Sequence, residues 1–440
     1  MRKSKIFICF FATLTCVSVL SYLKINSNNV EPPSVLGELY HLDSKNGNWK
    51  GIPANEKMED FAYLCEQLIE NYPFIDMMKR TQDINFEEVC NDYRNRISQC
   101  NTDFQFFVTI NMFLMELDNT GHLNLITPDA LEWYRNAYKN TAFMNKEDTI
   151  RANRLNATFN DELVVECYSK MDAQYSKTYE DVQKYYMNLE GEDFSQNEIV
   201  NEYSNLELKI LKENEIAYIK INSFLNDYYE QDKKLLFNFY EKVKDYDNVI
   251  FDITDNSGGA MSYFDDLVVA PNISEDMVLN AYELTKKGSI NAAYLDFQHY
   301  RPITELPNTL IELEEEDIKN LDIFRTIEYV VSPLYKSKKL HGNIWLLTSE
   351  NVYSSSEYAA IFAKSTGFAK LVGEITSGDG IGEDPLPLVL PNSHLVILYS
   401  AIYGVTDTGK CSVGNGTIPD IICDAEVALE TCLEEIKRDN

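Results

Sequence analysis

The chain has 440 residues, with 39 Lys and Arg against 70 Asp and Glu, so its formal net charge is −31. This acidic excess argues against a nucleic-acid-binding protein, because such a protein needs a basic surface that neutralises phosphates. The 45% hydrophobic and 12% aromatic content excludes a disordered acidic chain, since it supplies ample apolar surface for a packed core. The length predicts two or three domains.

The first predicted element is an N-terminal apolar segment. Three basic residues precede an uncharged run over 6–23, and Lys24 follows it. As a helix this run is about 27 Å long, close to the roughly 30 Å of a bilayer's hydrocarbon core. Basic residues before such a run keep the N-terminus cytoplasmic and direct the rest of the chain outward. The sequence therefore predicts a signal anchor or signal peptide over 1–24, so that the protein is secreted or attached to the cell membrane by this segment alone.

Helical spacing of apolar residues begins after a polar linker over 25–55. Apolar residues recur at intervals of three and four in the stretches 58–69, 85–98 and 104–117. These stretches predict a small N-terminal helical domain over 56–125. A mixed, Tyr-rich region over 126–204 connects it to the rest of the chain.

A different pattern starts near residue 205. Alternating residues predict a β-hairpin over 206–221, and apolar runs alternate with amphipathic stretches after it. The expected elements are helices at 226–243 and 354–364, strands at 249–253, 344–348, 370–373, 388–390 and 395–400, and a terminal helix from about 425. Strands that alternate with helices predict an α/β layered core over 205–440, with an insert at about 270–340. The acidic run 312–317 in this insert is interpreted as a solvent-exposed helix face.

The spacing of Cys and His residues indicates which metal and redox sites the sequence can form. Seven Cys lie outside the apolar run, and no C-x-x-C pair occurs. In an exported chain, some of these Cys can form disulfide bonds within 65–100 or within 411–432. The alternative is that they are small buried thiols in the core. The five His show no metal-ligand spacing, and no phosphate-binding glycine motif is present. The sequence therefore predicts no metal and no cofactor.

Three segments carry residues suited to catalysis, and the first ends in a glycine pair. Residues 252–259 read as a buried strand that runs into Gly258 and Gly259. The amides of adjacent glycines can approach a bound group without a Cβ in the way, as an oxyanion hole requires. An ordinary tight turn is the alternative interpretation.

The second and third segments carry a candidate nucleophile and a candidate base. Ser354 and Glu357 have the spacing of a helix capping box, which is a structural role. Ser354 at a helix start also suits a nucleophile, since the Ser355 amide and the positive end of the helix can stabilise an oxyanion. The third segment, 117–125, contains His122, and His is the commonest general base for a Ser hydroxyl.

Together these segments resemble the tail-specific, C-terminal processing serine peptidases, a superfamily that includes the tricorn core protease and interphotoreceptor retinoid-binding protein. The family motifs D-x-R-x-N-x-G-G, S-A-S-E, V-V-G-E-x-T-x-G, G-x-x-P-D and D-x-G-H resemble residues 252–259, 354–357, 371–378, 416–420 and 119–122. Thr254 stands where the first motif has Arg. The resemblance implies that Ser354 is the nucleophile, that His122 is the base, and that a small helical domain precedes a crotonase-like α/β core with a mixed sheet.

Two departures from the family pattern concern the base and its orienting acid. The Ser-Lys branch has its Lys where this chain has Asp379, and a carboxylate cannot replace an uncharged amine, so His122 is the expected base. The Ser-His-Glu branch has an acid just before the last motif, where this chain has Ser-Val-Gly-Asn over 412–415. Asp407, Asp379 or Ser412 is the expected orienting group in its place.

The first hypothesis is an exported serine endopeptidase that acts on a polypeptide substrate. Ser354 attacks the scissile carbonyl, His122 takes its proton, and the amides of Gly258, Gly259 and Ser355 bind the oxyanion. The alternative is a weakened or inactive relative that binds peptides or apolar ligands. A surface interaction protein without a catalytic cleft is a third hypothesis, and the sequence leaves the oligomeric state open.

Overall fold

The structure is a computed structural model that describes residues 51–118, 120–139, 146–171 and 204–439. The predicted signal segment 1–24, the linker up to residue 50 and much of the connecting region lie outside the described residues. Within the described ranges, none of the helices combines the length and the apolarity needed to span a bilayer.

The chain divides into two compact units, each built from three separate segments. Among the described residues, unit 1 contains those from 51 to 171 together with 286–298 and 384–401, and unit 2 contains 204–285, 299–383 and 402–439. These units differ from the predicted domain boundaries. The segments 286–298 and 384–401, which the sequence assigned to the C-terminal core, cluster with the N-terminal residues because they pair and pack with elements there.

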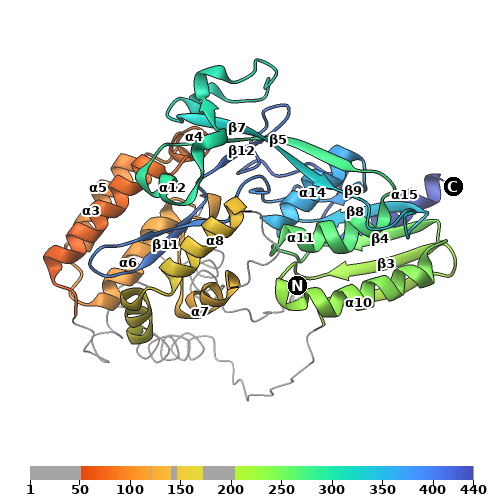
Figure 1. Cartoon of the computed structure of the whole chain (residues 1–440), viewed down its shortest axis with the longest axis horizontal. Helices are drawn as coiled ribbons and strands as arrows, with labels where there is room; N and C mark the ends of the chain where they lie inside the picture. Colours follow the sequence, from red (N-terminus) through yellow and green to blue (C-terminus); the bar gives the residue numbers. More distant parts are fainter. Residues whose placement is uncertain (1–50, 119, 140–145, 172–203, 440) are drawn as a thin grey trace, which may run out of the picture. The chain divides into compact units, whose positions relative to one another are not determined.

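Unit 1 begins with the helices α3 (Ala54–Asn71), α4 (Ile75–Gln82), α5 (Phe86–Ile97) and α6 (Asp103–Glu116). Helices α3, α5 and α6 confirm the predicted helices and lie side by side (Figure 1). Phe61, Leu64 and Leu68 recur at intervals of three and four along α3, and all three are fully buried. Side-chain caps from Asn85 and Thr102 begin α5 and α6.

A three-stranded antiparallel sheet follows in unit 1. Its order is β1 (Asn124–Leu125), β11 (Val396–Tyr399), β10 (Leu386–Val389). The unit also contains α7 (Pro128–Ala137), α8 (Lys146–Phe159) and α12 (Ser289–Tyr294). The Asn71 side chain at the end of α3 accepts from the amides of Ile290 and Asn291, each at 3.0 Å, which joins α12 to α3. Because β11 pairs with β1, the residues after β11 lie opposite the turn that precedes β1.

In the described part of unit 2, the main sheet has six strands in the order β13-β9-β8-β4-β3-β2. These strands are β2 (Leu206–Lys212), β3 (Ile216–Ile221), β4 (Asn248–Asp252), β8 (Asn343–Thr348), β9 (Lys370–Gly373) and β13 (Ile421–Ile422). Strands β2 and β3 form the predicted antiparallel hairpin, and the other neighbours pair in parallel. The mixed sheet and the N-terminal helices confirm the predicted fold class.

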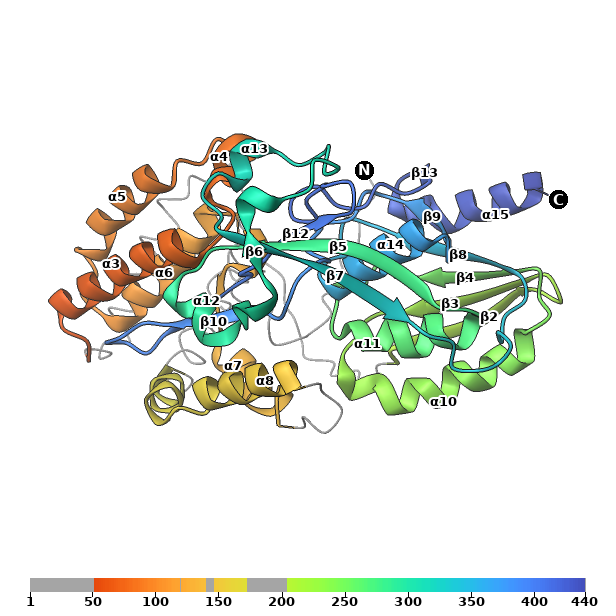
Figure 2. The ribbon, with the colours of Figure 1, turned by 45° about the horizontal axis from the view of Figure 1, so that its top comes forward.

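Helices cover both faces of this sheet. Ile219 and Phe251 enter a core that they share with α10 (Asn226–Val243), α11 (Met261–Phe264) and α14 (Ser355–Thr366). Tyr218 and Ile250, their neighbours in sequence, enter a second core with α15 (Ala428–Asp439). Figure 2 shows α10 and α15 on opposite sides of the strands. This arrangement follows from the alternation of side chains along each strand.

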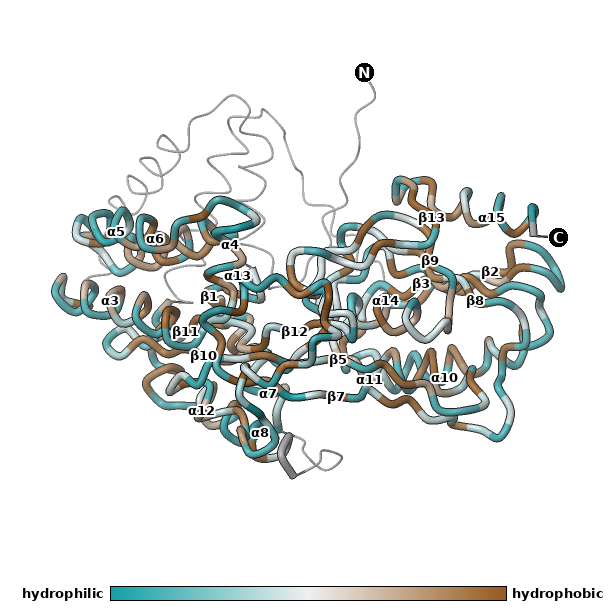
Figure 3. Tube along the Cα trace, turned by 90° about the horizontal axis from the view of Figure 1, so that it is seen from above, coloured by the Kyte–Doolittle hydropathy of each residue, from teal (hydrophilic) through white to brown (hydrophobic). Residues whose placement is uncertain are grey.

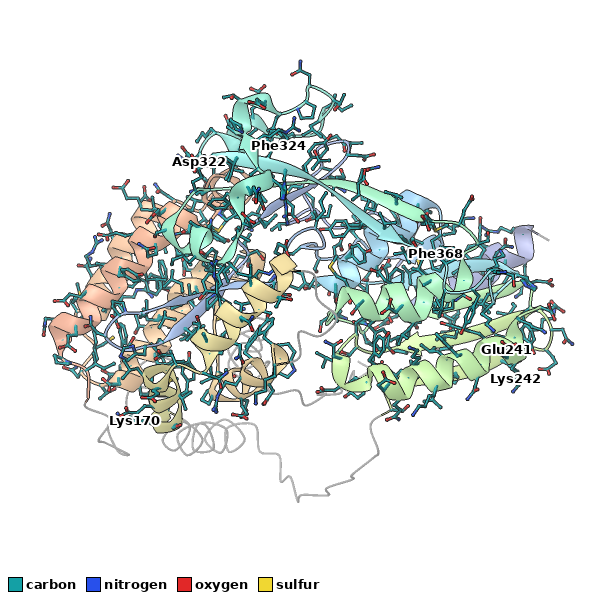
Figure 4. The ribbon with its side chains drawn as sticks, viewed as in Figure 1. Lys170, Glu241, Lys242, Asp322, Phe324 and Phe368 are labelled. Carbon is teal, nitrogen blue, oxygen red and sulfur yellow. The ribbon has the colours of Figure 1, made fainter. Side chains whose placement is uncertain are left out.

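Helix α10 is amphipathic in the sense that the sequence predicted. Leu236, Tyr240 and Val243 are fully buried at intervals of four and three. Hydrophilic and hydrophobic stretches alternate along α10 (Figure 3). Glu241 and Lys242 project from its last turns (Figure 4), and Glu241 forms an ion pair with Lys339.

The predicted insert contributes a second sheet, in the order β12-β5-β7-β6. Its strands are β5 (Met277–Thr285), β6 (Arg301–Pro302), β7 (Ile323–Val331) and β12 (Tyr403–Thr406), of which β5 and β7 form a long antiparallel ladder (Figure 2). The sequence predicted none of these strands. The interpretation of the acidic run as a fully exposed helix face is wrong at Asp317, which is completely buried and accepts from the Tyr403 hydroxyl at 2.9 Å.

The seven cysteines in the described residues are free thiols, and five of them are buried. The buried thiols pack as small apolar side chains.

Candidate active site

Ser354 occupies the turn between β8 and α14. Its φ of 59° and ψ of −124° put a non-glycine residue in a region where backbone strain is of order 1–3 kcal/mol. The Ser354 amide donates to the Gly378 carbonyl at 3.1 Å, and the Ser354 carbonyl accepts from the Tyr358 amide at 2.9 Å. A strained Ser between a strand and a helix is the arrangement that presents a nucleophilic hydroxyl in α/β hydrolases.

The capping-box interpretation of Ser354 is wrong. Ser354 stands directly before α14, but its side chain accepts no hydrogen bond from the helix amides. Glu357, the other half of the expected box, is fully buried and bonds to residues elsewhere. The Ser354 hydroxyl is therefore not used to begin the helix.

The glycine pair lies against Ser354. A Cβ added at Gly258 would lie 3.2 Å from the Ser354 Cβ and 3.4 Å from the Ser355 nitrogen. A Cβ at Gly259 would lie 2.3 Å from the backbone carbon of Phe224. Both glycines also have φ between 119° and 142°, a conformation that side chains rarely adopt. The pair is thus required by close approach, and the structure brings Gly258, Gly259, Ser354 and Ser355 together in unit 2.

The amides of these residues differ in their availability. The Gly258 amide donates to the Asn256 Oδ1 at 3.0 Å. The Ser355 amide belongs to the first turn of α14, where helix amides have no acceptor within the helix. In the described part of the chain, neither the Ser355 nor the Gly259 amide has a protein acceptor. These two amides are therefore the better candidates for oxyanion donors.

Asn256 joins the glycine turn to helix α14, which follows Ser354. Its Oδ1 accepts from the Ser356 hydroxyl at 2.7 Å and from the Gly258 amide, and its Nδ2 donates to the Ile221 carbonyl at 3.1 Å. Asn256 is completely buried, so water does not compete for these bonds. The sequence did not single out this residue, although it stands at the Asn of the first family motif.

Glu357 fixes the segment that holds Ser354. Its Oε1 accepts from the Thr417 hydroxyl at 2.6 Å, and its Oε2 accepts from the Gly378 amide at 3.3 Å. Burial raises the pKa of the Glu357 carboxyl, and the hydrogen bonds from Thr376, Thr417 and Gly378 act in the opposite direction. The Gly378 carbonyl accepts a hydrogen bond from the Ser354 amide. The Glu357 carboxylate therefore stabilises the strained Ser354 turn through Gly378.

Thr254, which stands where the first family motif has Arg, bonds to Asp252 two residues earlier. Asp252 accepts from the Thr254 hydroxyl at 2.7 Å and from the Thr254 amide at 2.9 Å. The Tyr218 hydroxyl donates to the same carboxylate at 2.6 Å. Thr254 therefore closes the end of β4 through Asp252.

His122 belongs to unit 1, in a 3₁₀ turn over Thr120–His122 that ends at β1. Its Nδ1 lies 3.2 Å from the Ser400 Oγ, and its carbonyl accepts from the Asn124 side chain at 3.0 Å. The side chain is half-buried. Asn119, the first residue of the matching motif, lies outside the described residues.

The three predicted orienting groups, Asp379, Ser412 and Asp407, lie in unit 2. The Asp379 carboxylate accepts from the Tyr353 hydroxyl at 3.0 Å, the Ser412 hydroxyl donates to the Gly404 carbonyl at 3.3 Å, and Asp407 is exposed after β12. The hydroxyl found at the His122 Nδ1 belongs to Ser400, a residue that no sequence motif singled out. In the sequence, Ser400 was visible only as the last residue of the predicted strand 395–400. That position places it near His122 only because β11 pairs with β1.

Within the described ranges, no group of three or more His, Cys, Asp or Glu side chains is arranged to hold a metal ion.

Residues 215–423 match the sequence model of peptidase family S41. The fold is similar to that of a protein from Parabacteroides merdae ATCC 43184 solved as a candidate peptidase, at 18% identity over 86% of this chain and 96% of that chain, with a TM-score of 0.52. It is also similar to mature CPAF complexed with lactacystin, at 9% identity over 88% of this chain and 97% of that chain, with a TM-score of 0.50. At such identities the similarity concerns the fold. The matched segment contains Gly258, Gly259, Ser354 and Ser355, so this part of the chain is similar to peptidase family S41, the tail-specific and C-terminal processing serine peptidases that its motifs resemble.

Proposed function

We propose that this serine-type peptidase is an endopeptidase in which Ser354 is the nucleophile and His122 is the general base. The observation that carries the proposal is the Ser354 turn. A serine with φ of 59° stands beside a glycine pair that close packing requires, and two unpaired amides lie in the same turn region. The match of residues 215–423 to peptidase family S41 supports a peptide bond as the substrate.

The reaction begins when the Ser354 Oγ attacks the scissile carbonyl carbon while its proton passes to the His122 Nε2. The carbonyl oxygen becomes an oxyanion, and the amides of Ser355 and Gly259 donate to it, with Gly258 shaping the turn. One such donor is typically worth about 3 kcal/mol in the transition state. The imidazolium then returns the proton to the leaving amine, and water hydrolyses the acyl-enzyme by the same route in reverse.

A weak or inactive peptidase-like binding protein is the second candidate. The observation that favours it is the hydroxyl at the His122 Nδ1, because a hydroxyl stabilises an imidazolium less than a carboxylate does. Such a protein would bind peptides or apolar ligands without turnover.

Labelling with a fluorophosphonate probe separates these candidates. We expect the full chain to be labelled at Ser354, as identified by peptide mapping, and the Ser354→Ala and His122→Ala variants to lose labelling. Ser365→Ala, at an exposed position on α14, and His341→Ala, an exposed His, are the matched controls. Equal labelling of the wild type and Ser354→Ala would contradict the proposal, and ligand binding without labelling would support the second candidate.

We also propose that the catalytic part is exported, because basic residues precede the uncharged run over 6–23. Protease added to intact cells should digest the protein if it is exposed outside the membrane. Protection from added protease before lysis, together with its recovery in the soluble cytoplasmic fraction, would contradict export.

A further inference from the structure

We propose that Ser400 is the positioning residue of His122: its Oγ accepts the Nδ1–H and thereby leaves the Nε2 unprotonated. This inference rests on the proposed function for its catalytic meaning, but the hydrogen bond can be measured without catalysis. It assigns the orienting role to a neutral hydroxyl that the sequence did not identify.

The geometry of the pair supports this role. The Ser400 Oγ lies 3.2 Å from the His122 Nδ1, within hydrogen-bond range. Only 5% of Ser400 is exposed, so bulk water does not displace it easily. A hydroxyl can accept and donate at once, and as an acceptor it selects the imidazole tautomer that a general base requires.

The backbone holds Ser400 in place. Its amide donates to the Gly121 carbonyl at 2.6 Å, which continues the β1–β11 pairing in which Asn124 faces Leu398. The preceding residue, Tyr399, is fully buried and donates to the Asn291 Oδ1 at 2.8 Å. The hydroxyl therefore projects from a fixed strand end.

The turn that carries His122 is fixed from the other side. The Tyr72 hydroxyl donates to the Thr120 carbonyl at 2.7 Å. Gly121 has φ of 58°, and a Cβ there would lie 2.6 Å from the ring of Phe74. His122 itself has φ of 54°, which is uncommon for a residue with a side chain. These contacts over-determine the position of the imidazole, which is how strained functional residues are maintained.

The proton balance distinguishes this arrangement from an acid-assisted triad. The Ser354 proton moves to the Nε2, the Nδ1 keeps its proton, and Ser400 accepts from the Nδ1 throughout. Ser400 therefore supplies orientation and tautomer selection without a full negative charge. Replacing a triad carboxylate by an amide lowers turnover by ~10⁴-fold because the amide favours the wrong tautomer. A hydroxyl acceptor avoids that loss, since it permits the productive tautomer.

Histidine ¹⁵N NMR on the full chain, labelled at its five His, tests the hydrogen bond directly. At a pH of about 8.5, well above the ordinary histidine pKa of about 6.5, we expect the His122 Nδ1 to show a protonated shift and the Nε2 an unprotonated one. The signal is assigned by its loss in His122→Asn. Ser400→Ala should move both nitrogens toward the average of two exchanging tautomers. An unprotonated His122 Nδ1 in the wild type overturns the inference, whatever Ser400→Ala shows.

The kinetics of fluorophosphonate labelling test the catalytic meaning. Ser400→Ala should lower the maximal labelling rate by about 10- to 100-fold and leave the half-saturating probe concentration nearly unchanged, because the probe does not need Ser400 for binding. Ser400→Thr retains the hydroxyl and should restore most of the rate. If Ser354→Ala abolishes labelling while Ser400→Ala labels like the wild type, the inference fails and the proposed function stands. If the wild type itself is not labelled, the proposed function fails, and the NMR result still decides the hydrogen bond.

Discussion

The Ser354 amide donates to the Gly378 carbonyl at 3.1 Å, and the Gly378 amide donates in turn to the Glu357 carboxylate at 3.3 Å. Ser354 and Glu357 are close neighbours in the chain, yet they are joined through a distant backbone segment. A buried carboxylate thus supports the strained conformation of the candidate nucleophile. Ser354 and Glu357 therefore belong to one hydrogen-bonded unit with Gly378, and they do not form a capping box.

Removal of the Glu357 carboxylate should loosen the Ser354 turn. We expect Glu357→Ala to lower the free energy of unfolding by about 2–4 kcal/mol, since it leaves buried donors unpaired and opens a cavity. Glu357→Gln keeps the volume and one acceptor oxygen, so its loss of stability should be smaller. Urea unfolding and the rate of fluorophosphonate labelling measure the two effects, with Glu430→Gln on the exposed side of α15 as the control. A Glu357→Ala variant that labels as fast as the wild type would refute this role.

A methyl group at Gly258 should disturb the turn more than a methyl group at Gly367. Both glycines have positive φ, so both substitutions carry backbone strain. At Gly258 the new Cβ would also meet the Tyr353 carbonyl at 3.0 Å, whereas nothing lies within 4 Å at Gly367. We therefore expect Gly258→Ala to reduce labelling of Ser354 strongly and Gly367→Ala to leave it intact with a modest loss of stability. Similar labelling rates for the two variants would contradict the packing argument.

The backbone strain at Ser354 predicts an unusual order of stability among its variants. Glycine tolerates φ of 59° with ψ of −124°, whereas alanine retains the steric conflict of the Cβ. Ser354→Gly should therefore be more stable than Ser354→Ala by about 1 kcal/mol, within the usual range of such strain. Both variants lack the hydroxyl, so neither should be labelled. Thermal unfolding of the pair checks the order, and a less stable glycine variant would count against strain at this position.

Asp265 should make the stability of the protein depend on pH. Burial raises the pKa of Asp265 to about 7, although the Tyr358 hydroxyl donates to its carboxylate at 3.0 Å and opposes the shift. The unfolded carboxyl titrates near its ordinary pKa of about 3.9, so the folded state holds the proton more tightly between the two values. The stabilisation is complete below about pH 4 and is lost as the pH rises through about 7.

The Asp265→Asn variant removes this titration. Relative to the variant, the free energy of unfolding of the wild type should fall as the pH rises from 4.5 to about 7.5, and the difference should remain constant above that. Asp276→Asn, at an exposed position just before β5, is the control. Urea unfolding at four pH values gives the result, and a pH-independent difference would exclude a raised pKa at Asp265.

Local sequence patterns predicted much of the fold because their signals are carried by neighbouring residues. The helices α3, α5 and α6 follow from apolar residues spaced three and four apart, and the hairpin β2–β3 follows from alternation on both sides of a polar turn. The β5–β7 ladder gave no comparable signal because its position depends on pairing across a long insert. Asp317 lies in a run that is acidic throughout, and only the Tyr403 hydroxyl explains its burial.

The sequence by itself determined the family motifs, the candidate roles of Ser354 and His122, and the α/β class of the core, since these depend on residue type and on spacing within short segments. Only the tertiary structure decided that Ser354 adopts a strained turn and does not cap its helix, that Gly258 lies against it, and that Ser400 meets His122. Each of these facts depends on backbone segments that are far apart in the chain. Hydrogen bonds and close packing across such distances leave no periodic trace in the sequence. For that reason the candidate nucleophile could be proposed from the sequence, while the residues that contact it could not.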